Sequence, residues 1–329
     1  MALVLVSSRS FGQVATIGTE ILEEAGFVVQ RIDPEDRPLN AANLARILAS
    51  VQPDVLIAGA ESIPRDVLSA SPNLKMVQKH GVGVDNIDLD AATELGIAVA
   101  NAPGTNTAAV ADLTIGLMLT ILRSIVEAAS TTRSGGWDRF IGHELGQATV
   151  GVVGTGRIGR DVIRRLSGFG SRVLAYDAYE DAELAAKTGI EYASLETLLR
   201  ESDIVTLHVP LMETTRELIS AERLSWMKPT AYLINIARGE LVDEEALAAH
   251  LEAGRIAGAA IDAFATEPPT ESPLLKLGNV VATPHIGAYT AEAMDCMARR
   301  CAETVLRVMD GERPENVLNR DAIPPGTRS

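Results

Sequence analysis

The sequence predicts an α/β protein of two doubly wound parallel sheets, with helices on both faces of each sheet. Short β-branched, apolar runs alternate with helical stretches through almost the whole chain, which is typical of buried parallel strands. The chain has 329 residues, which is long for one domain and comfortable for two. Hydrophobic residues make up 47% and charged residues 22%, as in ordinary globular proteins.

The first series of predicted strands ends near residue 101. The opening stretch, "MALVLVSSRS", has no charged n-region, and its apolar run is too short for a signal peptide, so we expect a buried strand there. Helical patterns separate the later strands, for example at residues 43–51 and 91–96. The predicted strands of this series are residues 2–7, 27–32, 54–60, 74–81 and 97–101.

A second series begins near Thr149. Between its strands lies a clear helix that starts after a predicted N-cap, Asp243, and ends at a predicted C-cap, Gly254. The predicted strands are residues 149–154, 172–177, 203–210, 231–237, 257–264 and 279–285.

Two long helices are expected to connect the two series, at residues 107–130 and 290–309. The chain would leave the first domain, build the second, and return. Residues 316–318 are a candidate final edge strand.

The charge and cysteine content exclude several functions. The net charge of −15 argues against a nucleic-acid backbone or an anionic membrane as a partner. No apolar run approaches the roughly 18 residues of a membrane span. Cys296 and Cys301 lie five residues apart on different faces of a predicted helix, so we expect no disulfide framework and no metal site. A reducing cytoplasm fits this cysteine content.

A glycine-rich turn follows the first strand of the second series. Gly154, Gly156 and Gly159 form a GxGxxG pattern between an apolar strand and a helix, which is the dinucleotide-binding fingerprint. Gly154 would permit the tight turn, Gly156 the approach of a pyrophosphate, and Gly159 the close packing of helix on strand. An ordinary glycine-rich turn is the alternative.

Asp177 ends the next predicted strand, 23 residues after Gly154. A carboxylate at about this spacing binds the ribose 2′-hydroxyl of NAD. It would repel a 2′-phosphate, and the following residues, Ala178, Tyr179 and Glu180, supply no positive charge. The sequence therefore predicts NAD as the cofactor, in preference to NADP.

Three side chains just past predicted strands suit hydride-transfer chemistry. Reduction of a ketone needs a proton for the oxygen and positive charge to polarise the carbonyl. Arg238 could bind a carboxylate and a carbonyl oxygen, and a histidine beside a carboxylate, as His285 and Glu267 would be, could carry the proton. Each has a structural alternative: a loop salt bridge for Arg238, a turn-shaping role for Glu267, and packing for His285.

These residues fall within motifs of a known family. The chain resembles the D-isomer-specific 2-hydroxyacid dehydrogenases, and within them the phosphoglycerate dehydrogenase branch, from about residue 50 to about residue 310. The motifs are "KHGVGVDNIDLDAA", "NAPGTNTAAVAD", "GVVGTGRIGR", "LHVPLMETT", "LINIARGELVDEEAL", "AAIDAFATEPP" and "TPHIGAYT".

The resemblance implies catalytic roles. Arg238 would bind the substrate carboxylate and keto group, and His285 would be the acid/base on the substrate oxygen. Glu267 would orient His285 and raise its pKa. Asp262 would hold the nicotinamide carboxamide, and Arg157 and Ile158 would contact the pyrophosphate.

The resemblance implies further contacts. The "HVP" motif (His208, Val209 and Pro210) would line the adenine side, although His208, like His80, has a structural role as the favoured alternative. The nicotinamide side would be lined by Ile236, Ala237, Gly287 and Ala288. The expected substrate contacts are Lys79, Asn106 and the backbone N–H groups of Val82 and Gly83.

The family organisation implies a split substrate-binding domain, flavodoxin-like, of residues 1–101 and 286–329. A Rossmann NAD-binding domain of residues 102–285 would be inserted into it. The resemblance also implies a homodimer, in which Trp137 and His143 of the arm "SGGWDRFIGHEL" reach the partner. His250 is expected to be solvated.

The substrate is expected to be a small anionic 2-hydroxy or 2-keto acid. Glu61 stands where the phosphoglycerate branch often has an arginine, whereas Lys79 keeps a positive charge and His80 could add to it. Tyr289 would narrow the pocket. 3-Phosphoglycerate is therefore one candidate, and glyoxylate or hydroxypyruvate is another. We hypothesise that Lys79 binds a second anionic group.

Two further expectations follow from the resemblance. No regulatory domain follows in this sequence, so serine feedback is not expected. An NADH-sensing corepressor is the alternative from a different class, although nothing in the sequence marks a peptide cleft.

Overall fold

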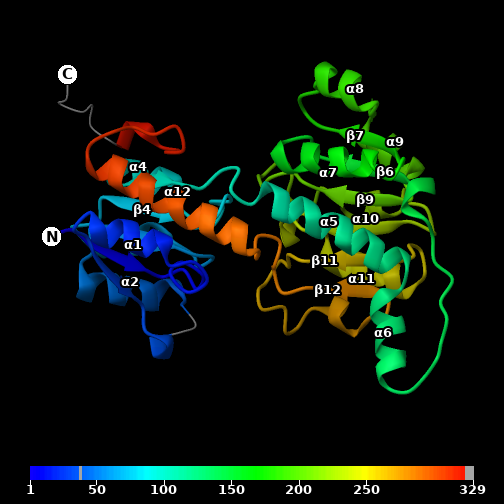
Figure 1. Ribbon diagram of the computed structural model, residues 1–329, viewed down its shortest axis with the longest axis horizontal. Coiled ribbons are helices and arrows are strands. Elements are labelled where there is room, and N and C mark those ends of the chain that lie inside the picture. The colour runs from blue at the N-terminus through cyan, green and yellow to red at the C-terminus, as the bar shows by residue number, and fades with distance from the viewer. Residues whose placement is uncertain (37–38, 323–329) are drawn as a thin grey trace. The chain divides into compact units, whose positions relative to one another are not determined.

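The computed structural model describes residues 1–36 and 39–322. The chain divides into two compact units (Figure 1). Unit 1 contains the described parts of Met1–Asn106 and Tyr289–Ser329, and unit 2 contains Thr107–Ala288. Each unit holds one sheet in which all strand pairs are parallel.

The unit boundaries lie a few residues beyond those expected from the sequence. Hydrogen bonds explain the difference. The N–H of Ala102 donates to the carbonyl of Gly81 at 2.9 Å, which keeps the segment after residue 101 in unit 1. The N–H of Gly287 donates to Asp262 at 2.9 Å, which keeps residues 286–288 in unit 2.

The sheet of unit 1 has the strand order β2-β1-β3-β4-β5. Its strands are β1 (Leu3–Val6), β2 (Val28–Arg31), β3 (Val55–Ala58), β4 (Met76–Lys79) and β5 (Ala98–Ala100). Its helices are α1 (Ile17–Glu24), α2 (Ala41–Val51), α3 (Arg65–Leu68), α4 (Leu89–Glu94) and α12 (Ala291–Met309), with short 3₁₀ turns η1 (Pro34–Asp36) and η5 (Arg320–Ala322).

Both faces of this sheet are buried. Leu5, Leu56 and Val77 pack with apolar residues of α2, α3 and α4. Val4 and Met76, which point the other way, are also fully buried, and on that side α1 and α12 pack together with α12 against β4 (Figure 1). The alternation follows from the two-residue period of a strand.

Two elements were expected in the C-terminal part of unit 1, a helix and an edge strand, and only the helix is present as expected. The helix expected at residues 290–309 is confirmed, and Thr290 caps it by accepting the N–H of Ala293. The edge strand expected at residues 316–318 is a single antiparallel bridge between Ala100 and Val317.

The sheet of unit 2 has the order β12-β11-β10-β9-β6-β7-β8. Its strands are β6 (Thr149–Val153), β7 (Arg172–Tyr176), β8 (Glu191–Tyr192), β9 (Ile204–Leu207), β10 (Tyr232–Asn235), β11 (Gly258–Ile261) and β12 (Val280–Ala282). Strand β8 has only two residues, too few to show a period, and the sequence analysis missed it.

The helices of unit 2 cover both faces of its sheet. Val150 and Val152 pack with α5 and α7, whereas Val153, Val205 and Leu207 pack with α9, α10 and α11. The helices are α5 (Thr107–Leu122), α6 (Ile125–Arg133), α7 (Arg157–Ser167), α8 (Ala182–Thr188), α9 (Leu195–Glu201), α10 (Ala221–Leu224) and α11 (Glu244–Glu252), with 3₁₀ turns η2 (Leu145–Gln147), η3 (Gly239–Leu241) and η4 (Pro273–Lys276).

The single helix predicted for residues 107–130 is wrong. The chain forms α5 and α6, which bend by 64° at Ser124, whose backbone is left-handed with φ 45°. Helix α5 is buried on the sheet, whereas α6 has no buried residue and projects from the rest of unit 2 (Figure 1). In the described part of the chain no single helix is long and apolar enough to cross a membrane, and α5 with α6 meets that test only as a bent pair.

Helix α11 shows one prediction confirmed and two corrected. Asp243 is the N-cap and accepts the N–H of Ala246 at 3.0 Å. The C-cap is Ala253, and Gly254 follows it with φ 62°. The prediction that His250 is solvated is wrong: it is 7% exposed, because it lies on the helix face that buries Leu247 and Leu251.

Candidate active site

The three catalytic candidates lie beyond the carboxyl ends of three neighbouring strands. Arg238 follows β10, Glu267 follows β11 and His285 follows β12, and these strands are adjacent in the sheet of unit 2. Because the strands are parallel, their carboxyl ends meet at one edge, where open α/β sheets bind ligands.

His285 and Glu267 are in direct contact. Nδ1 of His285 lies 2.8 Å from Oε1 and 3.0 Å from Oε2 of Glu267. The N–H of Phe264 donates to the same Oε1 at 3.2 Å. Because the carboxylate accepts from Nδ1, Nε2 is the nitrogen that can exchange a proton with a ligand. Both side chains are partly open, with 43% of His285 and 33% of Glu267 exposed.

The surroundings favour the ionised form of Glu267. Burial raises its pKa, but the hydrogen bond and charge of His285, the N–H of Phe264 and the charge of Arg238 together lower the pKa below its ordinary value. Glu267 therefore stays a carboxylate near neutral pH and can stabilise positive charge on the imidazole.

The backbone of His285 is unusual. Its φ is 52°, in the left-handed region that few residues other than glycine adopt. Asp262, which is 1% exposed, holds the surrounding segment. Its Oδ1 accepts the hydroxyl of Thr283 at 2.6 Å and the N–H of Ile286 at 2.8 Å, and its Oδ2 accepts the N–H of Gly287 at 2.9 Å. We call residues 283–287 the His285 loop.

Arg238 is fixed through its neighbours. Asn235 brackets it, because Nδ2 of Asn235 donates to the carbonyl of Arg238 at 2.7 Å and Oδ1 accepts the N–H of Ala237 at 3.1 Å. Gly239 packs directly on the Phe264–Ala265 backbone, which a Cβ on Gly239 would approach to 2.0 Å. The loop that carries Arg238 is therefore fitted to the loop that carries Glu267.

The glycine turn between β6 and α7 is tightly packed at Gly154 and Gly159 but open at Gly156, the N-cap of α7. Gly154 has φ 97°, and a Cβ there would lie 2.8 Å from the carbonyl of His208. A Cβ on Gly159 would lie 1.9 Å from the carbonyl of Gly154. A Cβ on Gly156, the N-cap of α7, would meet nothing within 4 Å. This leaves room for a phosphate at the positive N-terminus of α7.

Asp177 lies beside this turn. Its Oδ2 accepts the N–H of Thr155 at 2.6 Å, and its Oδ1 accepts the N–H of Tyr179 at 3.0 Å. Burial raises the pKa of Asp177, but the N–H groups of Tyr179, Thr155 and Ala178 and the Thr155 hydroxyl lower it below its ordinary value.

His208 is buried and neutral. Burial lowers the pKa of His208 to about 3, and its ring forms a hydrogen bond with the Thr206 hydroxyl at 3.0 Å.

Lys79 is the last residue of β4 in unit 1 and His80 follows it, and both are buried. Nζ of Lys79 donates to the carbonyl of Gly59 at 2.5 Å and to Oδ1 of Asn86 at 2.7 Å, and the residue is 8% exposed. Burial and the charges of Lys79 and Arg31 lower the pKa of His80 to about 4. The expectation that His80 adds positive charge beside Lys79 is therefore wrong at neutral pH.

The other predicted substrate contacts also lie in unit 1. Val82 and Gly83 are half-buried, and the carbonyl of Val82 accepts Nδ2 of Asn101 at 2.7 Å. Within residues 1–36 and 39–322, no donor reaches the buried Oδ1 of Asn106. That oxygen is therefore a buried acceptor with an unused hydrogen-bonding capacity.

Sequence reasoning missed three supporting residues: Asn235, Gly239 and Thr283. All three lie within the quoted motifs, Asn235 and Gly239 in "LINIARGELVDEEAL" and Thr283 in "TPHIGAYT". Their roles depend on hydrogen bonds or packing with other parts of the backbone, which the motifs do not show.

These features define a class of protein. Residues 115–287 match the family model described as "D-isomer specific 2-hydroxyacid dehydrogenase, NAD binding domain". The chain belongs to the D-isomer-specific 2-hydroxyacid dehydrogenases, a family of NAD-dependent oxidoreductases of small 2-hydroxy and 2-keto acids, and NAD is the cofactor of the matched domain.

Particular relatives differ in substrate. The chain is 45% identical over 275 residues to a D-3-phosphoglycerate dehydrogenase of Methanocaldococcus jannaschii; the match covers 82% of this chain but only 52% of that relative. It is 42% identical over 315 residues to a glyoxylate reductase of Thermofilum pendens, covering 93% and 92%. The solved D-lactate dehydrogenase of Aquifex aeolicus with NAD and lactic acid has a TM-score of 0.82 and 29% identity, covering 94% and 96%.

Proposed function

We propose that this chain transfers a hydride between NAD and C2 of a small D-2-hydroxy acid or its 2-keto acid. The observation that carries the proposal is the contact between His285 and Glu267 at the strand edge that also presents Arg238. This arrangement supplies an acid/base, a carboxylate to support it, and a cation for the substrate.

The residues present fit an NAD molecule. The open N-terminus of α7 at Gly156 suits the pyrophosphate, and the ionised Asp177 suits a ribose diol. When bound, NAD would supply or accept the hydride. The further cofactor contacts that we propose are Gly154, Arg157, Ile158, Gly159, His208, Val209, Pro210, Ile236, Ala237, Gly287 and Ala288.

The side chains would divide the remaining work. Arg238 would bind the carboxylate of the substrate and polarise its keto oxygen. In reduction, Nε2 of His285 would donate a proton to that oxygen as C2 accepts the hydride, and in oxidation it would take the proton back. Glu267 would hold the ring through Nδ1 and stabilise its protonated form.

Four residues of unit 1 are proposed as substrate contacts. Asn106 is supported by its buried, unbonded Oδ1, and Val82 and Gly83 are supported by being only half-buried. Lys79 has weaker support as a ligand for a second anionic group, because its ammonium already donates to Gly59 and Asn86.

The substrate question calls for a direct assay. Purified protein would be mixed with NADH and a panel of 2-keto acids: glyoxylate, hydroxypyruvate, its 3-phosphate and pyruvate. We expect NADH oxidation with at least one of them, and the ratios of kcat/KM name the substrate. Tight NADH binding without turnover of any acid, or of any D-2-hydroxy acid with NAD, would contradict the proposed function.

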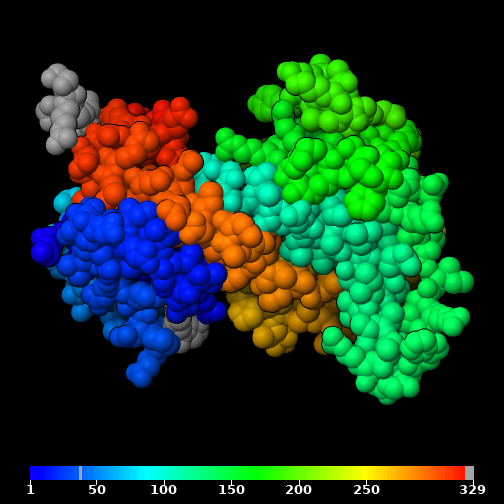
Figure 2. Space-filling model, in the orientation of Figure 1, coloured from blue at the N-terminus to red at the C-terminus, as the bar shows by residue number. Residues whose placement is uncertain are grey.

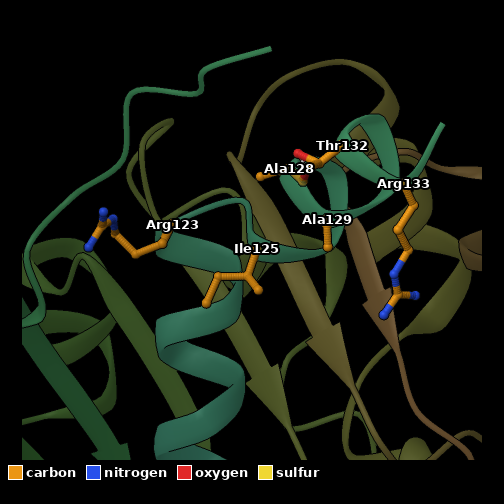
Figure 3. A pocket seen from close by; sticks show the side chains of 6 residues that line it. All are labelled: Arg123, Ile125, Ala128, Ala129, Thr132 and Arg133. Atoms are coloured by element: carbon orange, nitrogen blue, oxygen red, sulfur yellow. Dashed lines mark hydrogen bonds between the residues drawn. The ribbon is translucent and has the colours of Figure 1, made fainter. Parts of the chain in front are cut away.

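We also propose a homodimer built on α6 and the segment after it. Arg123, Ile125, Ala128, Ala129, Thr132 and Arg133 line a shallow pocket where α5 meets α6 (Figure 3). Beyond α6, Trp137 and Ile141 are 76% and 99% exposed. Figure 2 shows α6 and this segment as an outlying part of the surface of unit 2. Exposed apolar side chains of this size favour a protein partner.

A cytoplasmic location stays a prediction from the sequence.

A further inference from the structure

We propose that Asp262 is a positioning residue for His285. The inference rests on the proposed function, because it assigns a task to a residue that acts through the catalytic histidine. The family resemblance implies only a contact between Asp262 and the nicotinamide carboxamide, and this proposal adds a role within the protein.

The carboxylate of Asp262 holds both sides of the His285 corner. Before His285 it accepts the Thr283 hydroxyl at 2.6 Å, and after it the N–H groups of Ile286 and Gly287 at 2.8 and 2.9 Å. A carboxylate can accept several donors at once, and bonds to an ionised acceptor are stronger than bonds between neutral groups. The three donors lie on Thr283, Ile286 and Gly287, so Asp262 fixes the backbone both before and after His285.

The His285 loop needs this support because its backbone is in an uncommon conformation. His285 has φ 52°, and such a residue persists only where its surroundings over-determine it. No regular strand or helix includes residues 283–287. Gly287 also lies close to the carboxylate, since a Cβ there would be 3.2 Å from Oδ2 of Asp262.

The position of the corner sets the His285–Glu267 contact. Asp262 directly follows β11, the same strand whose following loop carries Glu267. One strand end therefore supplies both the residue that holds the His285 backbone and the residue that holds its ring. Displacement of a reacting group by about 1 Å can cost about 100-fold in rate. A loosened corner should therefore reduce the chemical step with little effect on cofactor affinity.

Two variants at different residues test this. Asp262→Asn replaces an acceptor oxygen with an NH₂ group that faces N–H donors, and Thr283→Val removes one bond without touching Asp262. Thr283→Ser keeps the hydroxyl and is the matched control. We expect kcat to fall about 100-fold in Asp262→Asn and about tenfold in Thr283→Val. The control should stay within twofold of the parent.

A binding measurement separates this role from contact with the carboxamide. The Kd for NADH, measured by fluorescence titration, should change less than threefold in Thr283→Val and Thr283→Ser, because both keep the Asp262 carboxylate. A large rise in Kd in Asp262→Asn with normal kcat in Thr283→Val would overturn the proposal in favour of the carboxamide contact alone.

A double-mutant cycle asks whether Asp262 acts through His285. In a His285→Asn background, adding Asp262→Asn should change the residual rate less than threefold. If the two losses multiply, Asp262 acts elsewhere and the proposal is wrong. If the parent protein reduces no 2-keto acid at all, the proposed function fails instead.

Nuclear magnetic resonance of isotope-labelled histidine gives a readout without turnover. The chain has only five histidines, and His285→Asn assigns the signal of interest by its loss. The Nδ1–H signal of His285 should shift or broaden in Asp262→Asn and Thr283→Val, and persist in Thr283→Ser. An unchanged signal in both variants would also overturn the proposal.

Discussion

His285 offers a residue-scale test of the proposed chemistry. His285→Asn removes the proton carrier but keeps a residue that tolerates the left-handed backbone at this position. We expect kcat to fall by about 10²- to 10⁴-fold, the usual contribution of general acid–base catalysis. Stopped-flow and steady-state assays with NADH would measure this.

The comparison variant for His285→Asn is Glu267→Gln, which changes the neighbouring carboxylate. Glu267→Gln keeps a hydrogen-bond acceptor for Nδ1 but loses the charge, so its rate loss should be smaller than that of His285→Asn. The Kd for NADH should be nearly unchanged in both. Near-normal turnover in His285→Asn would remove the acid/base assignment.

Asp177 offers a second residue-scale prediction, about the cofactor. Its pKa is lowered below its ordinary value, so the carboxylate is ionised at every pH above about 5. The kcat/KM for NADH should therefore exceed that for NADPH from about pH 5 to about pH 8, and the ratio should grow above about pH 6, where the 2′-phosphate loses its second proton. Asp177 itself becomes protonated, and stops repelling the phosphate, only as the pH falls through its lowered pKa.

The matched variant is Asp177→Asn, which removes the charge at nearly constant volume. It should narrow the ratio of kcat/KM for NADH to kcat/KM for NADPH throughout the range from about pH 5 to about pH 8, where Asp177 is ionised in the parent protein. A parent protein that uses NADPH better than NADH would show that Asp177 does not select the cofactor.

At the scale of the elements, Gly239 connects the loop of Arg238 to the loop of Glu267. Gly239→Ala would place a Cβ 2.0 Å from the backbone of Phe264 and Ala265, so the loops must separate. We expect a loss of about 1–3 kcal/mol in the free energy of unfolding. The kcat should also fall, because Arg238 and Glu267 move apart.

Gly278→Ala is the control for that prediction, since a Cβ there meets nothing within 4 Å. Urea unfolding and steady-state kinetics would be compared for the two variants. If Gly239→Ala were as stable and active as Gly278→Ala, the fit between the two loops would not matter for the site.

The elements also show where sequence patterns failed. Residues 107–130 read as one helix because apolar residues continue across the break, but Ser124 adopts a left-handed backbone and starts a new direction. Strand β8 is too short to carry a pattern. His250 lies on a helix whose buried face depends on packing against the sheet, which the local sequence does not encode.

At the scale of the whole molecule, the testable property is the oligomeric state. Light scattering after size exclusion should give twice the chain mass of 34.9 kDa. Trp137→Ser combined with Ile141→Asp should shift the protein to the monomer, because both side chains are exposed and apolar. Leu275→Asp, at an exposed residue outside this segment, should leave the mass unchanged. A monomeric parent protein would exclude the dimer.

By itself, the sequence determined the α/β class, nearly every strand, the glycine turn, and the three residues that follow β10, β11 and β12. Those features depend on local periodicity, on glycine, and on motifs that lie within one short segment. Only the tertiary structure decided that Nδ1 of His285 meets Glu267, that Lys79 and His80 are buried, and that Asp262 holds the His285 loop. These depend on contacts between loops that are distant in the chain, and on burial, which sets both the geometry and the charge of each group. The sequence already marked the Pro–His–Ile–Gly segment as a stiff corner, and the structure adds the three hydrogen bonds that Thr283, Ile286 and Gly287 donate to Asp262.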